Sequence, residues 1–282
     1  MQRQFNTSSF LFAATFFVLA LPAAAEENAA WRSWPMGDRF IIAVGAFFPN
    51  IDTKVSASSA SNPVSAKIDF ERDLGMDDSL TRPLGAFVWR FAKNHRLEVN
   101  YFNLNRSGDV ISKTRITIGD LVIEAGVPVQ SFLDIEVIEG LYTYSLVFTE
   151  KVEWSVGLGL SFQDVDIGIQ ADDGQIIDSQ DISVALPLPT LSTTLGYAFT
   201  DKLIGRLKLG WLAVEADVSD STDFHGAIWN GSAGFRYKAF KNVGFDFGWS
   251  YFQVDVDYFK RDLIGELDYR YHGPLVAIEW VF

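Results

Sequence analysis

Histidines are the side chains best suited to acid–base chemistry near neutral pH, and the sequence has three of them, His95, His225 and His272. A catalytic histidine needs a nucleophile or a carboxylate within hydrogen-bonding reach. His225 follows Asp220 and Asp223 and is the best candidate for protease-like chemistry. His272 has no serine two residues away. No set of base, nucleophile and orienting group is recognisable, so the sequence predicts no catalytic residue and no enzymatic activity.

Carboxylates form a second group, because their oxygens are hard ligands suited to Ca²⁺ or Mg²⁺. Asp172-Asp173-Gly174 is the most metal-like stretch, but it lacks the spacing of a full calcium-binding loop. We therefore predict no metal site and no cofactor, and treat divalent cations as an open alternative at a solvated acidic rim. This acidic group comprises Asp69, Glu71, Asp73, Asp77, Asp78, Asp164, Asp166, Asp172, Asp173, Asp178, Asp217, Asp220, Asp223, Asp255, Asp257 and Asp262.

A third group of charges alternates with apolar residues along strand-like segments. Four of these side chains are positive and four are negative, which favours ion pairs over a lining of one sign. Enclosed charges must pair, because an uncompensated buried ion costs several kcal/mol, to order of magnitude. The eight residues are Arg90, Glu98, Glu153, Arg206, Lys208, Arg236, Asp246 and Glu279.

The elements that would position these charges are best seen at the end of the chain. Alternate side chains of a strand point to opposite faces, so Val276, Ile278, Trp280 and Phe282 form one apolar stripe while Glu279 faces the other way. A stripe that ends in aromatic residues is typical of a strand whose outer face contacts lipid.

The N-terminus has the pattern of a secretory signal peptide. Arg3 precedes an apolar run at 10–21, and Ala23-Ala24-Ala25 offers a small-residue cleavage site. We predict a cleaved signal at 1–25, a periplasmic N-terminal segment at 26–37 and an outer-membrane β-barrel at 38–282. The absence of cysteine leaves neither a lipidation site nor a disulfide.

After residue 25 no apolar run reaches the ~20 residues that a membrane-spanning helix requires. In hydrocarbon every backbone N–H and C=O needs a partner within the protein, which only helices and closed sheets provide. The expected fold is therefore an all-β, antiparallel, up-and-down transmembrane barrel. The net charge of −13 becomes −14 when Arg3 is removed with the signal, which argues against a nucleic-acid partner.

Two kinds of break set the strand count. Short, lysine-containing breaks at 92–94, 149–151, 200–202 and 240–242 predict periplasmic turns, and longer or acidic breaks at about 49–80, 107–127, 171–180, 219–223 and 259–263 predict outer loops. Ten strands follow, with both termini in the periplasm. Hairpins at 64–71 or 114–124 would lie in the loops or raise the count to twelve, and merging the early strands would lower it to eight. The expected strands are 38–48, 82–91, 95–106, 129–148, 152–170, 181–199, 203–218, 224–239, 243–258 and 264–282.

A barrel of this size is narrow enough for side chains to fill much of its interior. The eight alternating charges then become a lumen charge network, and a plugged lumen is favoured over a hydrated pore. The aromatic residues beside the short turns are expected to form the periplasmic girdle. They are Trp89, Phe91, Tyr197, Phe199, Phe235, Tyr237 and Trp280.

With these elements in place, the mature chain resembles small Gram-negative outer-membrane barrels of the broad OmpA, OmpW and opacity type, and more narrowly barrels of unassigned function. The resemblance rests on the stretches 68–75, 240–244 and 265–274. It implies an outer-membrane location, contact with membrane lipid and lipopolysaccharide, and insertion by the barrel-assembly machinery. It transfers no catalytic residue. OmpA proper has a soluble peptidoglycan-binding domain after its barrel, whereas this sequence ends with its last strand, so cell-wall anchoring is not expected.

The resemblance also implies an assembly signal, formed by Val276, Ile278, Trp280 and Phe282. Three functions remain open from the sequence. The first is a non-enzymatic envelope barrel with a plugged lumen and acidic loops that contact lipopolysaccharide, ions or other surfaces. The second is a narrow channel for small solutes. The third is a hydrolase at the outer rim, acting on lipid A or peptides through His225 or His272.

Overall fold

The computed structural model describes residues 30–59, 62–113, 115–118, 121–172, 177–219, 222–260 and 263–282. The predicted signal peptide and the first residues after it lie outside this part of the chain. Among the described residues no helix is both long and apolar enough to cross a membrane.

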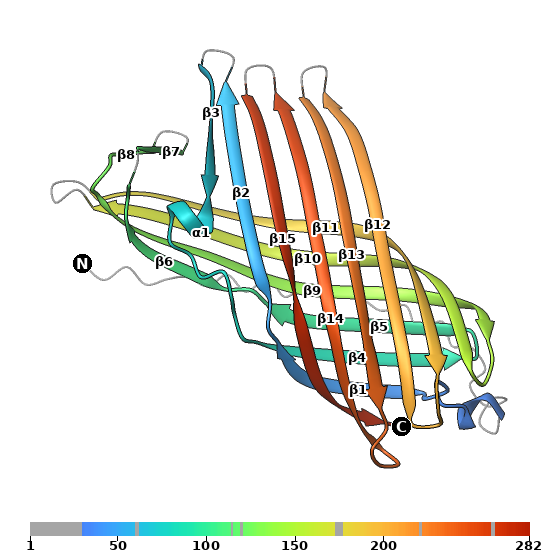
Figure 1. Ribbon diagram of the computed structural model, residues 1–282. Coiled ribbons are helices and arrows are strands. Elements are labelled where there is room, and N and C mark those ends of the chain that lie inside the picture. Colours follow the sequence, from blue (N-terminus) through green and yellow to red (C-terminus); the bar gives the residue numbers. More distant parts are fainter. Residues whose placement is uncertain are drawn as a thin grey trace, which may run out of the picture.

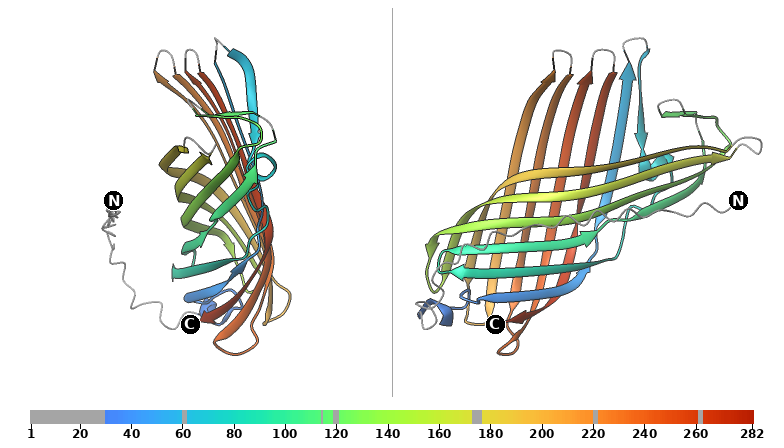
Figure 2. Two further views of the ribbon diagram at one scale, coloured as in Figure 1. Left: turned by 90° about the vertical axis from the view of Figure 1, so that its left-hand side faces the viewer. Right: turned by 180° about the vertical axis from the view of Figure 1, so that it is seen from behind.

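Ten antiparallel strands form a closed barrel (Figures 1 and 2). The first and last strands close it, with seven register pairs from Ile41↔Val281 to Phe47↔Leu275. The all-β fold and the strand number predicted from the sequence are both confirmed. The ten strands are β1 (Phe40–Phe47), β4 (Arg82–Ala92), β5 (His95–Asn103), β9 (Pro128–Phe148), β10 (Val152–Asp172), β11 (Ile177–Ala198), β12 (Leu203–Ser219), β13 (Thr222–Tyr237), β14 (Val243–Lys260) and β15 (Leu263–Val281).

The two possible extra hairpins lie at the outer end and do not cross the barrel wall. Strand β2 (Asn50–Ser59) pairs with the outer part of β15 and with β3 (Asn62–Asp69). The second hairpin joins β7 (Ile116–Ile118) to β8 (Leu121–Ile123) in a separate small sheet. A further strand, β6 (Arg106–Ile111), extends the outer edge of β9, and a single helical turn, α1 (Phe70–Asp73), follows β3.

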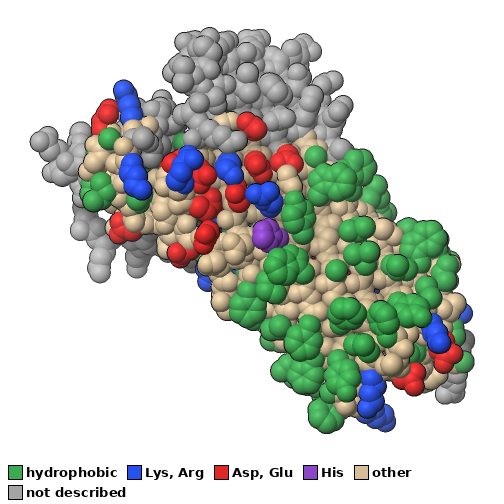
Figure 3. Space-filling model, in the orientation of Figure 1, with side chains coloured by type: hydrophobic (Ala, Val, Ile, Leu, Met, Phe, Trp, Pro, Cys, Tyr) green, Lys and Arg blue, Asp and Glu red, His purple; other side chains and the backbone are tan. Residues whose placement is uncertain are grey.

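The exterior of the barrel is apolar over a broad belt (Figure 3). On β10, for example, Trp154, Leu158 and Phe162 expose 45, 64 and 54% of their surface, although each is a large hydrophobic residue. The intervening Ser155 and Ser161 are buried inside the barrel. This inversion, with apolar side chains outside and polar side chains inside, is the pattern of a strand whose outer face contacts lipid.

The outer halves of the strands separate into two leaves (Figure 2). Strands β10 and β11 are paired along their whole length, from Val152↔Tyr197 to Asp172↔Ile177. Strands β11 and β12, in contrast, are paired only from Leu191↔Trp211 to Ala198↔Ile204. Beyond Leu191↔Trp211, the outermost of these pairs, β11 leans away with β9 and β10, while β12 continues beside β13.

Candidate functional site

The periplasmic half of the lumen holds a cluster of buried ion pairs formed by residues of β4, β5 and β10. Arg90 on β4 places Nη2 2.6 Å from Oε1 of Glu153 on β10, and Ser145 donates a hydrogen bond of 2.7 Å to the same oxygen. Arg96 on β5 lies with Nη1 3.7 Å from the other Glu153 oxygen and also pairs with Glu98. Arg90 and Glu153 are only 1 and 2% exposed, so the carboxylate balances charge that water does not reach.

A second pair of charges joins β13 to the last strand. Arg236 donates a hydrogen bond of 2.8 Å to Oε1 of Glu279. Asp38, just before β1, accepts a hydrogen bond of 2.8 Å from Lys238 Nζ and lies 3.8 Å from Arg236. The segment preceding the barrel is therefore held to its wall by charge as well as by packing.

Nearer the middle of the lumen, Lys208 on β12 lies 3.4 Å from Glu139 on β9. Asn100 on β5 donates a hydrogen bond of 3.0 Å to Glu139. Arg206 and Asp246 line the lumen below this level, and neither forms an ion pair within 4.0 Å among the described residues.

The structure thus places six of the eight charges predicted for the lumen in ion pairs, and Arg206 and Asp246 beside them. Sequence reasoning missed four participants: Asp38, Arg96, Glu139 and Lys238. Arg96 shares its strand and parity with Glu98, so the alternation contained the signal for it. Asp38 could not be found in this way, because it precedes the first strand.

The periplasmic end of the barrel is covered by the N-terminal segment. A 3-10 turn at Ala30–Ser33 places Trp31 and Met36, which are 5 and 2% exposed, against Phe148 and Ile204 of the barrel. The ring of Trp34 meets that of Phe148 edge-on, with centroids 5.1 Å apart. We call this segment, residues 30–37, the N-terminal cap.

Two cavities lie in series within the lumen. The inner cavity measures about 210 Å³ and is bordered by Arg96, Arg206 and Arg236 together with Glu98, Asp246 and Glu279. The outer cavity measures about 190 Å³, and aromatic and aliphatic side chains share its wall with Asn230 and the Lys208–Glu139 ion pair. Asn100 and Lys208 border both cavities and therefore lie between them.

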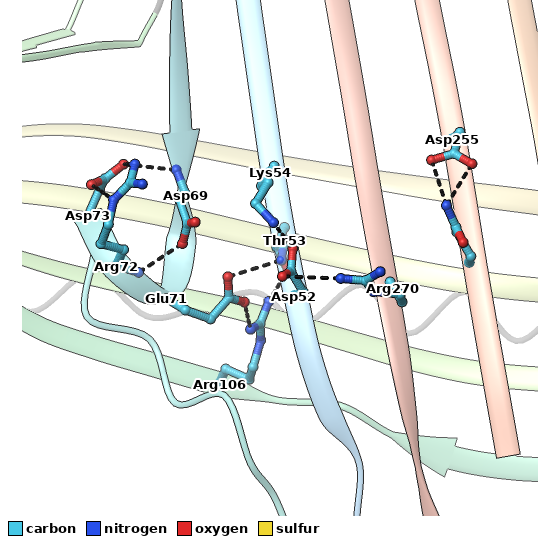
Figure 4. A network of polar contacts seen from close by, with 11 residues as sticks. Asp52, Thr53, Lys54, Asp69, Glu71, Arg72, Asp73, Arg106, Asp255 and Arg270 are labelled. Carbon is cyan, nitrogen blue, oxygen red and sulfur yellow. Dashed lines mark hydrogen bonds and ion pairs between the residues drawn. The ribbon is translucent and has the colours of Figure 1, made fainter.

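Above the apolar belt, charged side chains connect α1 to two strands (Figure 4). Glu71 accepts a hydrogen bond of 3.0 Å from the backbone N–H of Thr53 on β2 and pairs with Arg106 on β6. Arg106 also donates to the Thr53 hydroxyl at 2.5 Å. Because Glu71 and Arg106 come from different leaves, this contact ties the two leaves together on that side of the barrel.

Ion pairs at this outer end lower the pKa of two carboxyl groups. The hydrogen bond from Arg72 holds the pKa of Asp73 below its ordinary value, partial burial opposes the shift, and the backbone N–H of Asp69 assists it. The hydrogen bond from Lys54, at 2.5 Å, likewise lowers the pKa of Asp52. Both carboxylates are consequently ionised at neutral pH and act as acceptors.

The histidines lie in ordinary aromatic surroundings. His95 Nδ1 is 2.7 Å from the Tyr142 hydroxyl near a periplasmic turn, and His272 stacks on Trp249 with ring centroids 5.8 Å apart. The side chain of His225 lies outside what the structure describes. The same holds for residues 173, 220 and 262 of the acidic rim and for the side chains of residues 172, 178, 217, 223 and 257. Within the described residues no group of three or more His, Asp or Glu side chains is arranged to hold a metal ion.

No protein-family model and no curated protein matches the sequence. Among solved structures, the chain is similar to the outer membrane protease OmpT from Escherichia coli, with a TM-score of 0.52 at 9% identity over 86% of this chain and 97% of that one. OprG from Pseudomonas aeruginosa aligns at 12% identity over 87% of this chain and 97% of that one, with a TM-score of 0.32. A FadL homologue from the same organism aligns at 9% identity over 87 and 91%, with a TM-score of 0.37.

The OmpT likeness concerns the fold. Together with the closed ten-stranded sheet, the apolar belt and the polar lumen, it defines the protein as an integral β-barrel of the Gram-negative outer membrane.

Proposed function

We propose that the protein is a non-enzymatic envelope barrel whose lumen is closed to axial passage and whose role lies in its outer loops. The N-terminal cap is the observation that carries this proposal, because Trp31 and Met36 are almost fully buried across the periplasmic mouth. The Arg90–Glu153 pair lies directly above it, with the Arg90 guanidinium 4.3 Å from the centre of the Phe148 ring. A solute leaving the lumen would have to displace the cap, which covers the mouth beneath this pair.

The proposed surface role rests on the charges above the apolar belt. Asp52, Lys54 and Arg270 form exposed or half-exposed ion pairs on the outer parts of β2 and β15. Groups of both signs at this height suit contact with lipopolysaccharide, in which phosphates alternate with bound divalent cations. Carboxylates would share the cations, and guanidinium groups would bind phosphate oxygens.

The experiment is a planar-bilayer recording on residues 26–282 refolded in detergent. We expect no steady openings from the wild type, and openings from the triple variant Trp31→Ala/Trp34→Ala/Met36→Ala, in which the cap loses its buried side chains. Trp229→Ala is the matched control, because Trp229 is 52% exposed on the lipid-facing surface. Steady conductance of the wild type would refute the closed lumen.

A narrow channel is the second candidate, and the two cavities in series favour it. Arg206 borders the inner cavity without an ion-pair partner among the described residues, as a guanidinium in a solute path would. If the wild type does conduct, Arg206→Ala should change its single-channel conductance and its anion preference. An unchanged conductance would place the path elsewhere.

A further inference from the structure

Strand β12 has an unpaired edge at the outer end of the barrel. Its register with β11 ends at Leu191↔Trp211, whereas its register with β13 continues to Ser219↔Thr222. In Figures 1 and 2, β12 accordingly forms the free margin of the upright leaf. Trp211 and Trp229 are 45 and 52% exposed, with ring centroids 5.9 Å apart, and such an aromatic pair marks a membrane interface. Since an open strand edge is not tolerated in hydrocarbon, the edge beyond Trp211 lies on the aqueous side.

Three residues of β12 direct their backbone groups to this edge. Near the start of the strand, Leu203 accepts a hydrogen bond from the N–H of Phe199, on the β11 side. The N–H and C=O of one residue point to the same side of a strand and alternate from residue to residue. Ala213, Glu215 and Asp217 therefore direct both groups away from β13, and the described part of the chain supplies no strand that pairs with them.

The sequence of β11 explains why its own strand does not occupy this edge. Continued in the same register, Pro189 would lie opposite Ala213 and Pro187 opposite Glu215. Proline has no N–H, so neither residue would donate to the carbonyl group that it faces. A strand without proline at these two positions would donate to both. The edge is thus vacant because of its neighbour, while β12 itself keeps every donor and acceptor.

Acidic residues flank the unpaired edge on both leaves. Glu215 and Asp217 belong to the edge itself. On the other leaf Glu136, Asp164 and Asp166 are exposed, and Asp164 is the register partner of Glu136. Strands β9, β10 and β11 and the part of β12 beyond Trp211 contain no lysine or arginine. A surface with charge of one sign attracts the opposite sign, and carboxylates that face each other across a ladder are stabilised by an intervening cation.

A second copy of this chain fits the edge poorly. Two copies in one membrane are related by an axis along the membrane normal, so their β12 strands would run parallel. The acidic residues of both strands would then lie side by side, which is unfavourable. The charge of the edge suits a basic chain instead.

We propose that the unpaired edge of β12 binds an extended, lysine- or arginine-bearing segment of a partner polypeptide, which adds to the sheet as a further strand. The backbone groups of Ala213, Glu215 and Asp217 supply the affinity, and the surrounding carboxylates select basic side chains at alternate positions of the segment. This interaction goes beyond the proposed function, because neither the N-terminal cap nor the ion pairs around Asp52 takes part in it.

The probe is a fluorescein-labelled peptide of alternating lysine and valine, titrated with folded protein in a nonionic detergent and followed by fluorescence anisotropy. We expect saturable binding, and none of a peptide with glutamate in place of lysine. The lysine peptide N-methylated at every residue keeps its charge but donates no backbone hydrogen bond, so it should bind at least about tenfold more weakly. Isotope-edited infrared spectroscopy of a peptide with heavy carbon at its carbonyls should show a β-sheet band in the complex.

The edge itself is tested by variants of β12. Ala213→Pro removes one donor from the free edge and none from the β12–β13 ladder, so it should weaken binding about fivefold to tenfold. Ala213→Val is the matched control, because it keeps the N–H and a good strand residue, and it should bind as the wild type does. Glu215→Gln/Asp217→Asn should weaken binding at low salt and reduce its salt dependence. Heat-modifiable gel migration establishes that each variant is folded.

The outcomes that would contradict the proposal are distinct. Absence of saturable binding, or equal binding of the N-methylated peptide or by Ala213→Pro, would overturn strand addition. Equal binding of the glutamate peptide would overturn the selection of basic side chains. Dimers of the protein in detergent that disappear in Ala213→Pro would assign the edge to a second copy of this chain.

Discussion

Removing the Glu153 carboxylate should destabilise the barrel strongly. In Glu153→Ala, Arg90, which is 1% exposed in the wild type, loses the only carboxylate that it contacts among the described residues. Removing one partner of a buried ion pair lowers the free energy of unfolding by roughly 3–5 kcal/mol, because the other charge is left uncompensated. Arg90 keeps a hydrogen bond of 2.9 Å to the Lys93 carbonyl and its contact with Phe148, and Arg96 keeps Glu98. We therefore expect the lower end, about 3 kcal/mol, or roughly a 100-fold change in the folding equilibrium.

The assay is equilibrium urea unfolding in detergent, followed by tryptophan fluorescence. Glu124→Gln is the matched control, because the Arg115–Glu124 pair is 63 and 65% exposed and such pairs are worth at most about 1 kcal/mol. The double variant Arg90→Met/Glu153→Gln should recover most of the loss, because it removes both charges. A Glu153→Ala effect no larger than that of the exposed control would refute the reasoning that the pair is buried and mutually compensating.

Three further outcomes are expected. Asp73→Asn should lower the unfolding midpoint at pH 7, and the difference from the wild type should vanish at low pH. A carboxyl group whose pKa is lowered in the folded state stabilises the fold at pH values above its ordinary pKa of 3.8, and this stabilisation is lost as the pH falls through the lowered pKa. A difference that does not depend on pH would contradict this. Gly108→Ala should displace the chain at Leu74, because the Cβ of the alanine would lie 2.2 Å from the Leu74 carbonyl oxygen. The displaced chain should then be cleaved faster in limited proteolysis, and unchanged cleavage would argue against this packing. Phe282→Ala should reduce insertion into the outer membrane in cells, with little effect on refolding in detergent. Both are measured by heat-modifiable gel migration. Insertion equal to that of the wild type would show that Phe282 is not part of the proposed assembly signal.

The proposed function assigns two tasks to different residues. In this proposal the N-terminal cap closes the axial path, and the charges around Asp52 and Arg270 make the contacts at the cell surface. Each set can be altered without changing residues of the other.

The strand pattern was readable from the sequence because it depends on a local period of two. Every predicted strand matches an observed one within a few residues, as with 203–218 against Leu203–Ser219. The alternation also separated Trp154, Leu158 and Phe162, which are exposed to lipid, from the residues of the lumen. Lipid replaces water as the outer solvent, so the usual rule is inverted and the apolar stripe marks the outside.

Which side chains meet was decided only by the tertiary structure. Arg90 and Glu153 are 63 residues apart, and their contact depends on the registers of β4, β5, β9 and β10 together. The packing of Trp31 and Met36 into the barrel end has no periodic signature in the sequence. Alternation specifies the face to which a side chain points, whereas closure of the sheet specifies its partner, because a small change of register moves every cross-strand contact at once.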